Sequence, residues 1–314
     1  MTTTGFFLTL GAVCLSTVLL SQKEYEFAST GQQKLLLNPA LAGNTKGFDV
    51  QTLYARHKYF NSYYTGISYN GKKFGFAISN TNYASVPHSR DLSNQTDLGI
   101  SYTIKLGQKV TLVPALQVSY IEKKQYYTNL EFLNPLIDYY LPYNTDNAQT
   151  KRAGIVSTGF LLDFHKKITF GAAFYNINQP DMGINYNEPV CFSQAYHVAM
   201  LLFKENKISL QPYFVVKLQN IHQYYYETGA YATYKNTVTL HTGIKKAFYS
   251  KYVHDYTFDD AFYLVAGVSL NYKTLRLGYT AIASGGSETF AHELFLSANL
   301  FGKYQKQTYN LMLN

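Results

Sequence analysis

The sequence predicts an all-β fold, a transmembrane antiparallel β-barrel of about 14 strands with short periplasmic turns and longer extracellular loops. Apolar and polar residues alternate along many segments, and tight turns alternate with longer connections. Aromatic residues make up 17% of the 314 residues, whereas charged residues make up only 15%. This composition fits strands that face lipid on one side and a lumen on the other.

The alternation is clearest in TLVPALQVSY, residues 111–120. Every second residue from Leu112 to Tyr120 is apolar, and the residues between them are mostly small or polar. The stretches TVTLHTGIK, 237–245, and TLRLGYTA, 274–281, repeat the pattern. Because adjacent residues of a strand point to opposite faces, each strand has one apolar face and one lumen-type face.

The connections distinguish a membrane barrel from a soluble sandwich, whose strands would also alternate. Every second connection is tight, while 121–151 forms a long one. Lipid offers no hydrogen-bond partner, so the sheet is expected to close and remove its edges. The expected strands are 47–56, 61–70, 73–81, 96–105, 109–120, 152–163, 167–176, 193–203, 207–218, 224–234, 236–246, 260–271, 273–282 and 289–300.

The chain is expected to divide into four parts, none of them a second globular domain. Residues 1–21 have the pattern of a signal peptide, although their first segment lacks Lys and Arg. Lipidation at Cys14 is the alternative, which the bulky Val13 before it disfavours. Residues 22–45 form a leader or a plug at the periplasmic mouth, 46–301 the outer-membrane barrel, and 302–314 a C-terminal tail.

Charge and tyrosine placement point to the membrane surface. The net charge of +8 does not indicate nucleic acid binding, because no basic helix or zinc-ligand spacing accompanies it. Tyrosines at 63–64, 139–140, 224–226 and 263 fall near strand ends and predict interfacial girdles. Many lysines lie at the tight turns. Solvated turns account for most of them, but a basic periplasmic rim for an acidic partner would comprise Lys72, Lys73, Lys109, Lys166, Lys167, Lys204 and Lys207.

The stretch LLLNPALAGN, residues 35–44, predicts a capped helical turn before the first strand. Asn38 can cap it, Pro39 suits its first position, and Gly43 can adopt the left-handed conformation that ends it. Such a turn could fill the periplasmic mouth of the barrel. The alternative interpretation is a simple turn that leads into the first strand.

Enzymatic motifs are weak in this sequence. His292 and Glu293 are not followed by the second histidine of a zinc-protease helix, and in a strand they would point to opposite faces. A hydrogen-bonding role in the lumen is the simpler interpretation. Ser287 lies in a glycine-rich loop without a nucleophile elbow, and no lysine and helix follow to bind a phosphate. We therefore expect neither catalysis, nor a cofactor, nor a metal site.

Several motifs resemble those of the PorP/SprF family of type IX secretion system membrane proteins of Bacteroidetes. LLLNPALAG resembles the signature that follows the family's signal peptide, and NINQP, 176–180, resembles its Asn-x-Asn-Gln-Pro segment. LQPYFVVKLQ, 210–219, and GYTAIASGGSETFAHELFL, 278–296, are similar to its proline-containing strand and its C-terminal hairpin. The residues that match these motifs are Asn38, Pro39, Gly43, Asn178, Gln179, Pro180, Gly285, Gly286, Ser287, His292 and Glu293.

The resemblance implies a non-enzymatic, multi-pass protein of the cell outer membrane. Family members work with the periplasmic ring of the secretion and gliding machinery, or help to export and anchor large adhesins at the cell surface. The partners implied are outer-membrane lipid and a secreted adhesin or ring components. The alternative function is passive transport of a small apolar solute. Because the lumen faces carry mostly small residues, we expect a narrow or plugged lumen.

Overall fold

The computed structural model describes residues 34–45, 47–56, 60–71, 73–85, 92–125, 149–183, 189–205, 207–220, 223–249, 261–284 and 290–300. The expected signal peptide and C-terminal tail lie outside these residues. No helix in the described part is long and apolar enough to cross a membrane. The two short helices are α2 (Lys34–Leu37) and η2 (Pro39–Leu41).

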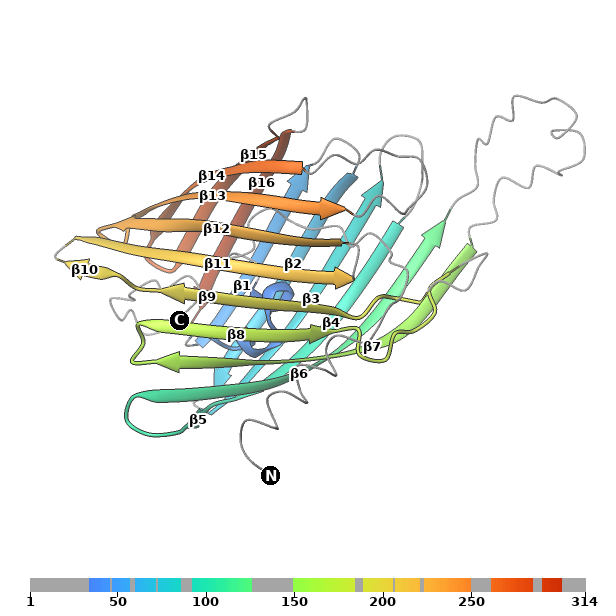
Figure 1. Ribbon diagram of the computed structural model, residues 1–314, viewed down its shortest axis with the longest axis horizontal. Coiled ribbons are helices and arrows are strands. Elements are labelled where there is room, and N and C mark those ends of the chain that lie inside the picture. The colour runs from blue at the N-terminus through green and yellow to red at the C-terminus, as the bar shows by residue number, and fades with distance from the viewer. Residues whose placement is uncertain are drawn as a thin grey trace, which may run out of the picture.

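The strands form one antiparallel sheet (Figure 1). They are β1 (Gly47–Arg56), β2 (Phe60–Gly71), β3 (Phe74–Ser85), β4 (Leu92–Tyr102), β5 (Ile104–Lys105), β6 (Val110–Gln125), β7 (Gln149–Phe164), β8 (Ile168–Tyr175), β9 (Ser193–Met200), β10 (Phe203–Glu205), β11 (Ile208–Asn220), β12 (Gln223–Tyr234), β13 (Val238–Tyr249), β14 (Ala261–Tyr272), β15 (Leu275–Ser284) and β16 (Phe290–Leu300).

The sheet closes on itself. β1 pairs with both β2 and β16, and β9 pairs with both β8 and β11, so the ladder continues around the ring. β4 and β5 share one position beside β6, and β9 and β10 share one beside β11. The 16 segments therefore make 14 barrel strands. The predicted closed antiparallel barrel is confirmed.

The burial of β6 shows which face meets lipid. Leu116, Val118 and Tyr120 are 47–49% exposed, whereas Gln117 and Ser119 between them are only 2% exposed. The apolar stripe therefore points outward and the small, polar stripe points into the lumen. This is the arrangement of a membrane barrel and the reverse of a soluble one.

The tight turns all lie at one end of the barrel, on the left in Figure 1. They join β2 to β3, β5 to β6, β7 to β8, β10 to β11, β12 to β13 and β14 to β15. His165, Lys166, Lys235, Asn236 and Lys273 adopt positive φ angles of 49–56° there. Such left-handed residues match the right-handed twist of the flanking strands. This end is the periplasmic one.

Two strands are longer than the hydrophobic pattern predicts. The expected strands 109–120 and 152–163 extend as β6 and β7 to Gln125 and back to Gln149. Their outward face turns polar beyond Tyr120, so the apolar pattern ends where the lipid ends. The backbone ladder continues, because cross-strand hydrogen bonds do not depend on lipid contact.

The predicted tyrosine girdle is confirmed for only some of its residues. Tyr63 and Tyr224 are exposed outward, but their neighbours Tyr64 and Tyr225 are 3% and 6% exposed and point into the lumen. Consecutive strand residues alternate between faces, so a run of tyrosines cannot all lie at the membrane interface. Tyrosines 139 and 140 lie outside the described residues.

Candidate functional site: a plug in the barrel lumen

Residues 34–44, which we call the plug, lie inside the barrel before the chain enters β1. Leu35, Leu37, Ala40 and Leu41 are all 5% exposed or less. Figure 1 shows the plug as a short blue coil within the barrel outline, and η2 contacts β4, β6 and β7. An apolar segment of this length has no core of its own, so the lumen wall provides the burial that orders it.

Local chemistry shapes the plug around Asn38. The backbone of Asn38 is extended, and its side-chain oxygen accepts a hydrogen bond from the backbone N–H of Ala40 at 2.9 Å. Pro39 begins the 3₁₀ turn, and the N–H of Ala42 donates to the Pro39 carbonyl at 3.0 Å. Gly43 then takes a φ of 65°. Each of these three positions suits the residue type that fills it.

The same Asn38 side chain attaches the plug to the barrel wall. Its Nδ2 donates to the backbone carbonyls of Phe160 in β7 and Ala172 in β8, both at 3.1 Å. Nδ2 also lies 3.3 Å from His197 Nε2. The amide oxygen therefore caps the turn while the amide nitrogen docks it. Folding of the plug and its seating in the lumen depend on one side chain.

The barrel also satisfies carbonyl groups along the rest of the plug. The Tyr175 hydroxyl donates to the Leu36 carbonyl at 3.0 Å, and the Ser101 hydroxyl donates to the Ala42 carbonyl at 2.7 Å. Asn70 Nδ2 donates to the Gly43 carbonyl at 2.5 Å. These donors come from three different strands, so the plug is held from several directions.

Glycines in the wall let the plug approach the sheet closely. A Cβ atom added at Gly75 would lie 2.1 Å from the Ala42 carbonyl oxygen, and one added at Gly159 would lie 2.3 Å from Asn38 Oδ1. At Gly99 the nearest atom would be the Ala42 Cβ at 3.5 Å, an ordinary contact. Two of the three positions therefore exclude any larger residue while the plug is seated.

Apolar side chains of the plug pack against two sides of the lumen. Leu37 and Leu41 pack in one buried cluster with Leu161 of β7 and Tyr213 of β11. Leu36 packs against a second buried cluster contributed by β1, β2 and β16. The plug thus touches walls that face each other across the lumen.

A group of large polar side chains fills the lumen beside the plug. We call Tyr213, Glu227, Tyr231 and His241 the lumen network; all four are buried. The Tyr213 hydroxyl donates to Glu227 Oε1 at 2.6 Å and lies 2.7 Å from His241 Nε2. The ring of Tyr231 stacks on His241 with centroids 4.4 Å apart.

Small residues make room for this network as well. A Cβ atom added at Gly229 or Gly243 would lie 2.7 or 2.8 Å from the Tyr213 hydroxyl oxygen. No residue of the network is distinguished by the sequence pattern alone. The available signal is the pair Gly229 and Gly243, because two inward glycines in register leave space for one large side chain from a neighbouring strand.

The NINQP motif lies at the opposite end of the barrel from the tight turns. Asn178 Oδ1 accepts from the Val156 N–H at 2.9 Å, and its Nδ2 donates to the Gly154 carbonyl at 2.7 Å. The side chain thus replaces a strand partner along β7. The Gln179 N–H donates to the Asn176 carbonyl at 3.0 Å.

The same segment closes a short loop. The Pro180 carbonyl accepts from the Val190 N–H at 2.9 Å. Lys151 Nζ donates to Asp181 Oδ2 at 2.5 Å. These contacts give the motif a structural role at the loop end.

The C-terminal motif residues point in two directions. Glu293 is buried in the lumen, while His292 faces outward and its Nδ1 lies 2.5 Å from the Tyr279 hydroxyl. Gly285, Gly286 and Ser287 lie outside the described residues. In the described part, no group of three or more His, Cys, Asp and Glu side chains could hold a metal ion.

Most of the lysines expected to form a rim lie exposed at the periplasmic end. They are distributed over several turns, with Lys166 and Lys167 on the same one, so the positive charge is spread around the mouth. Lys204 lies in β10 at the same end, and Lys72 lies outside the described residues. The exposed members are Lys73, Lys109, Lys166, Lys167 and Lys207.

Comparison with known proteins identifies related sequences and folds. The profile of one family, described as "Type IX secretion system membrane protein PorP/SprF", matches residues 22–298. A comparison with curated proteins gives no match.

Among solved structures, the barrel is similar to the Pseudomonas putida toluene transporter TodX. The TM-score is 0.54 at 10% identity, over 90% of this chain and 98% of that one. It is also similar to a structure described as "CymD monoaromatic hydrocarbon channel", with a TM-score of 0.53 at 9% identity, over 85% of this chain and 91% of that one. At such low identity, these likenesses show a shared outer-membrane barrel fold alone.

Proposed function

Because the chain belongs to the PorP/SprF family of type IX secretion system membrane proteins, we propose that it is a non-enzymatic, non-conducting barrel of that machinery. It helps to export and anchor a large surface adhesin, or it links the periplasmic ring to the outer membrane. The observation that carries the proposal is the plug, which the barrel holds by hydrogen bonds and by contacts with facing walls.

The seated plug supports a scaffold rather than an open pore. Solute flow needs a continuous path, and the plug contacts facing walls of the lumen next to the buried lumen network. A scaffold acts instead through its outer surfaces. Reconstituted protein is therefore expected to show no large steady ion conductance in planar bilayers; a large conductance of the wild-type protein would contradict the proposal.

The exposed basic rim supports a periplasmic contact with an acidic protein. Lysines on several turns at one mouth create a positive field that favours encounter with a negatively charged surface. The expected partner is a ring component or the adhesin in transit. Each lysine alone contributes little, because exposed charges are screened by salt.

Copurification from native membranes tests both parts. The variant carries Lys73→Glu, Lys109→Glu, Lys166→Glu, Lys167→Glu and Lys207→Glu, and a matched control carries arginine at the same five positions. We expect quantitative mass spectrometry to show about tenfold lower recovery of type IX partners with the glutamate variant only. Equal recovery with both would rule out the rim, and wild-type protein that recovers no secretion component would rule out the scaffold.

Passive transport of a small apolar solute is the second candidate, favoured by the fold shared with the hydrocarbon transporters. It requires the plug to leave a path for the solute. Toluene entry into liposomes that contain the wild-type protein would be faster than into empty liposomes if this function held. The scaffold proposal expects equal rates.

A further inference from the structure

The outward face of one wall changes from apolar to polar partway along the strands. On β3, exposed Phe76 and Ile78 are followed on the same face by Asn80 and Asn82. On the neighbouring β4, exposed Leu98 is preceded by polar residues at 96 and 94. These outward polar side chains are unexpected in a surface that meets lipid, because a bare amide in hydrocarbon is costly.

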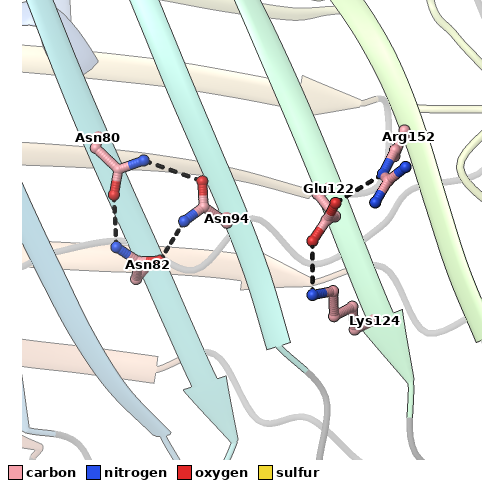
Figure 2. Close-up of polar contacts among 6 residues, drawn as sticks. All are labelled: Asn80, Asn82, Asn94, Glu122, Lys124 and Arg152. Atoms are coloured by element: carbon pink, nitrogen blue, oxygen red, sulfur yellow. Dashed lines mark hydrogen bonds and ion pairs between the residues drawn. The ribbon is translucent and has the colours of Figure 1, made fainter. Parts of the chain in front are cut away.

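Three of them form a closed ring of hydrogen bonds (Figure 2). Asn80 Nδ2 donates to Asn94 Oδ1 at 3.0 Å, Asn94 Nδ2 donates to Asn82 Oδ1 at 2.5 Å, and Asn82 Nδ2 donates to Asn80 Oδ1 at 2.5 Å. Asn80 Nδ2 also donates to Thr96 Oγ1 at 2.9 Å. Each amide donates and accepts, so the ring can lie at the edge of the lipid. Asn82 and Asn94 each use one of their two N–H groups in it.

A charged group adjoins the amide ring on the next two strands (Figure 2). Asn94 is in register with Glu122 of β6, which is in register with Arg152 of β7. Glu122 accepts from Lys124 Nζ at 2.9 Å and from Arg152 Nε at 2.7 Å. Two cations share one carboxylate, so the group carries one excess positive charge. The Arg152 side chain is 61% exposed and has further N–H groups for a ligand.

The order of these groups follows the direction out of the membrane. Asn82 stands eight residues from the turn end of β3. At ~3.3 Å per residue and ~40° of tilt, it lies ~20 Å along the barrel axis, near the top of a ~25 Å apolar band. Glu122 stands twelve residues from the start of β6, or ~30 Å along the axis. Apolar side chains, amides and then cations therefore succeed one another towards the cell exterior.

On β13 and β14 of the opposite wall, the corresponding outward positions carry no amides. Ile244 stands six residues into β13, as Asn80 does in β3, and it is exposed and apolar. Leu264 stands eight residues from the turn end of β14, as Asn82 does in β3, and it is also exposed and apolar. Lys246, eight residues into β13, lies on the same outward face as Ile244, so the opposite wall carries a cation at that level but, unlike the wall of β3 and β4, no ring of amides.

We propose that this wall binds one phosphorylated glycolipid of the outer leaflet. Acyl chains lie on the apolar side chains of β3, β4 and β6, sugar hydroxyls meet the amide ring, and a phosphate meets the two cations. Charge complementarity and the matching order of groups favour this amphiphile over a protein. Its contact surface, which we call the outer polar face, comprises Asn80, Asn82, Asn94, Thr96, Glu122, Lys124 and Arg152.

Glycolipid retention by the purified full-length protein tests the proposal. The protein in detergent is incubated with lipid A bearing its core sugars, and native mass spectrometry counts the glycolipid retained per barrel. Lys124→Glu with Arg152→Glu is compared with Lys235→Glu and Lys273→Glu, which make the same charge change on exposed turns at the periplasmic end. We expect about tenfold lower retention in the first variant, equivalent to ~1.4 kcal/mol, and no change in the control.

Two further experiments identify which parts of the glycolipid the protein recognises. Dephosphorylated glycolipid should bind the wild-type protein as weakly as phosphorylated glycolipid binds the double-glutamate variant. Asn82→Ala with Asn94→Ala should lower retention of both glycolipids. Electrophoresis without boiling checks that each variant is folded, and glutamine replaces glutamate where a variant does not fold.

Three outcomes would overturn the proposal. One is equal glycolipid retention by the wild-type protein and the Lys124/Arg152 variant. Another is equal retention of phosphatidylglycerol and the glycolipid by the wild-type protein, since an anionic phospholipid lacks the sugars. The third is unchanged glycolipid together with loss of a copurifying protein, which would make the face a protein-docking surface.

Discussion

The two sides of the lumen are filled in different ways. Beside β3, β4, β7 and β8, the wall presents glycines and backbone carbonyls, and a separate segment of chain, the plug, fills the space. Beside β11, β12 and β13, the wall fills its own space with the lumen network. The first arrangement can come apart while the barrel stays closed; the second cannot, because its side chains belong to the wall.

This difference separates two kinds of stability. Contacts of the plug stabilise its seating, so their loss should expose the plug and open the lumen before the barrel unfolds. Contacts within the lumen network stabilise the barrel itself, so their loss should lower the free energy of unfolding without opening a path. Conductance and protease cleavage of the plug distinguish the two effects.

Gly75→Ala should have the largest effect, because the added Cβ would lie 2.1 Å from the Ala42 carbonyl oxygen. Backbone atoms of the plug must move, and we expect the seating to weaken by about 3 kcal/mol. Protease cleavage of the plug and single-channel conductance should both rise. Gly99→Ala is the matched control, since its Cβ would make an ordinary 3.5 Å contact with the same plug residue. Similar behaviour of the two variants would contradict the proposed seat.

Asn38→Ala should rank second, with a loss of about 2.5 kcal/mol from the cap and the docking hydrogen bonds together. Asn38→Asp separates the two roles. It keeps the oxygen that caps Ala40, but it puts a carboxylate opposite the carbonyls of Phe160 and Ala172. We expect it to raise protease cleavage of the plug at least as much as alanine does. Wild-type protection of the aspartate variant would mean that the cap alone orders the plug.

Tyr213→Phe tests the other side of the lumen. It removes the hydroxyl that lies between Glu227 and His241 but keeps the ring. A hydrogen bond to a carboxylate is worth about 1.5 kcal/mol or more, so the free energy of unfolding in urea should fall by that amount. Conductance should stay at the wild-type level, because the variant keeps the ring that packs with Leu37 and Leu41. A rise would show that the Tyr213 hydroxyl also holds the plug. Tyr234→Phe, on an exposed tyrosine at the turn end, should change neither quantity.

Much of the barrel can be predicted from the sequence, because each strand shows its own alternation of apolar and polar residues. The pattern gives 47–56 as the first strand with the bounds that β1 has. The predicted strand bounds are wrong where the hydrogen-bonded ladder is interrupted, as at Thr103 between β4 and β5. They are also wrong where a strand extends beyond its apolar segment, as β6 does. Local periodicity reports what a strand faces, whereas strand length depends on its hydrogen-bonded neighbours.

The plug's docking could not be predicted in the same way. Asn38 is recognisable as a cap because the residues that it caps are adjacent in sequence. Its docking carbonyls lie 122 and 134 residues away, and they come within reach only when the barrel closes. The lumen network depends on closure in the same manner, since Tyr213 and His241 belong to strands that are not adjacent. Contacts across a lumen produce no periodic pattern in the sequence, so they cannot be predicted from it.

Tyr175→Phe should have the smallest effect and shows how the plug leaves its seat. It removes the hydroxyl that donates to the Leu36 carbonyl at 3.0 Å and keeps the ring that Lys217 Nζ approaches to 5.9 Å. One hydrogen bond corresponds to about 1 kcal/mol. If the plug detaches first at α2, limited proteolysis should show about fivefold faster cleavage near Leu36, with Asn38 still docked and conductance unchanged. Simultaneous rises in cleavage and conductance would instead mean that the plug leaves as one unit.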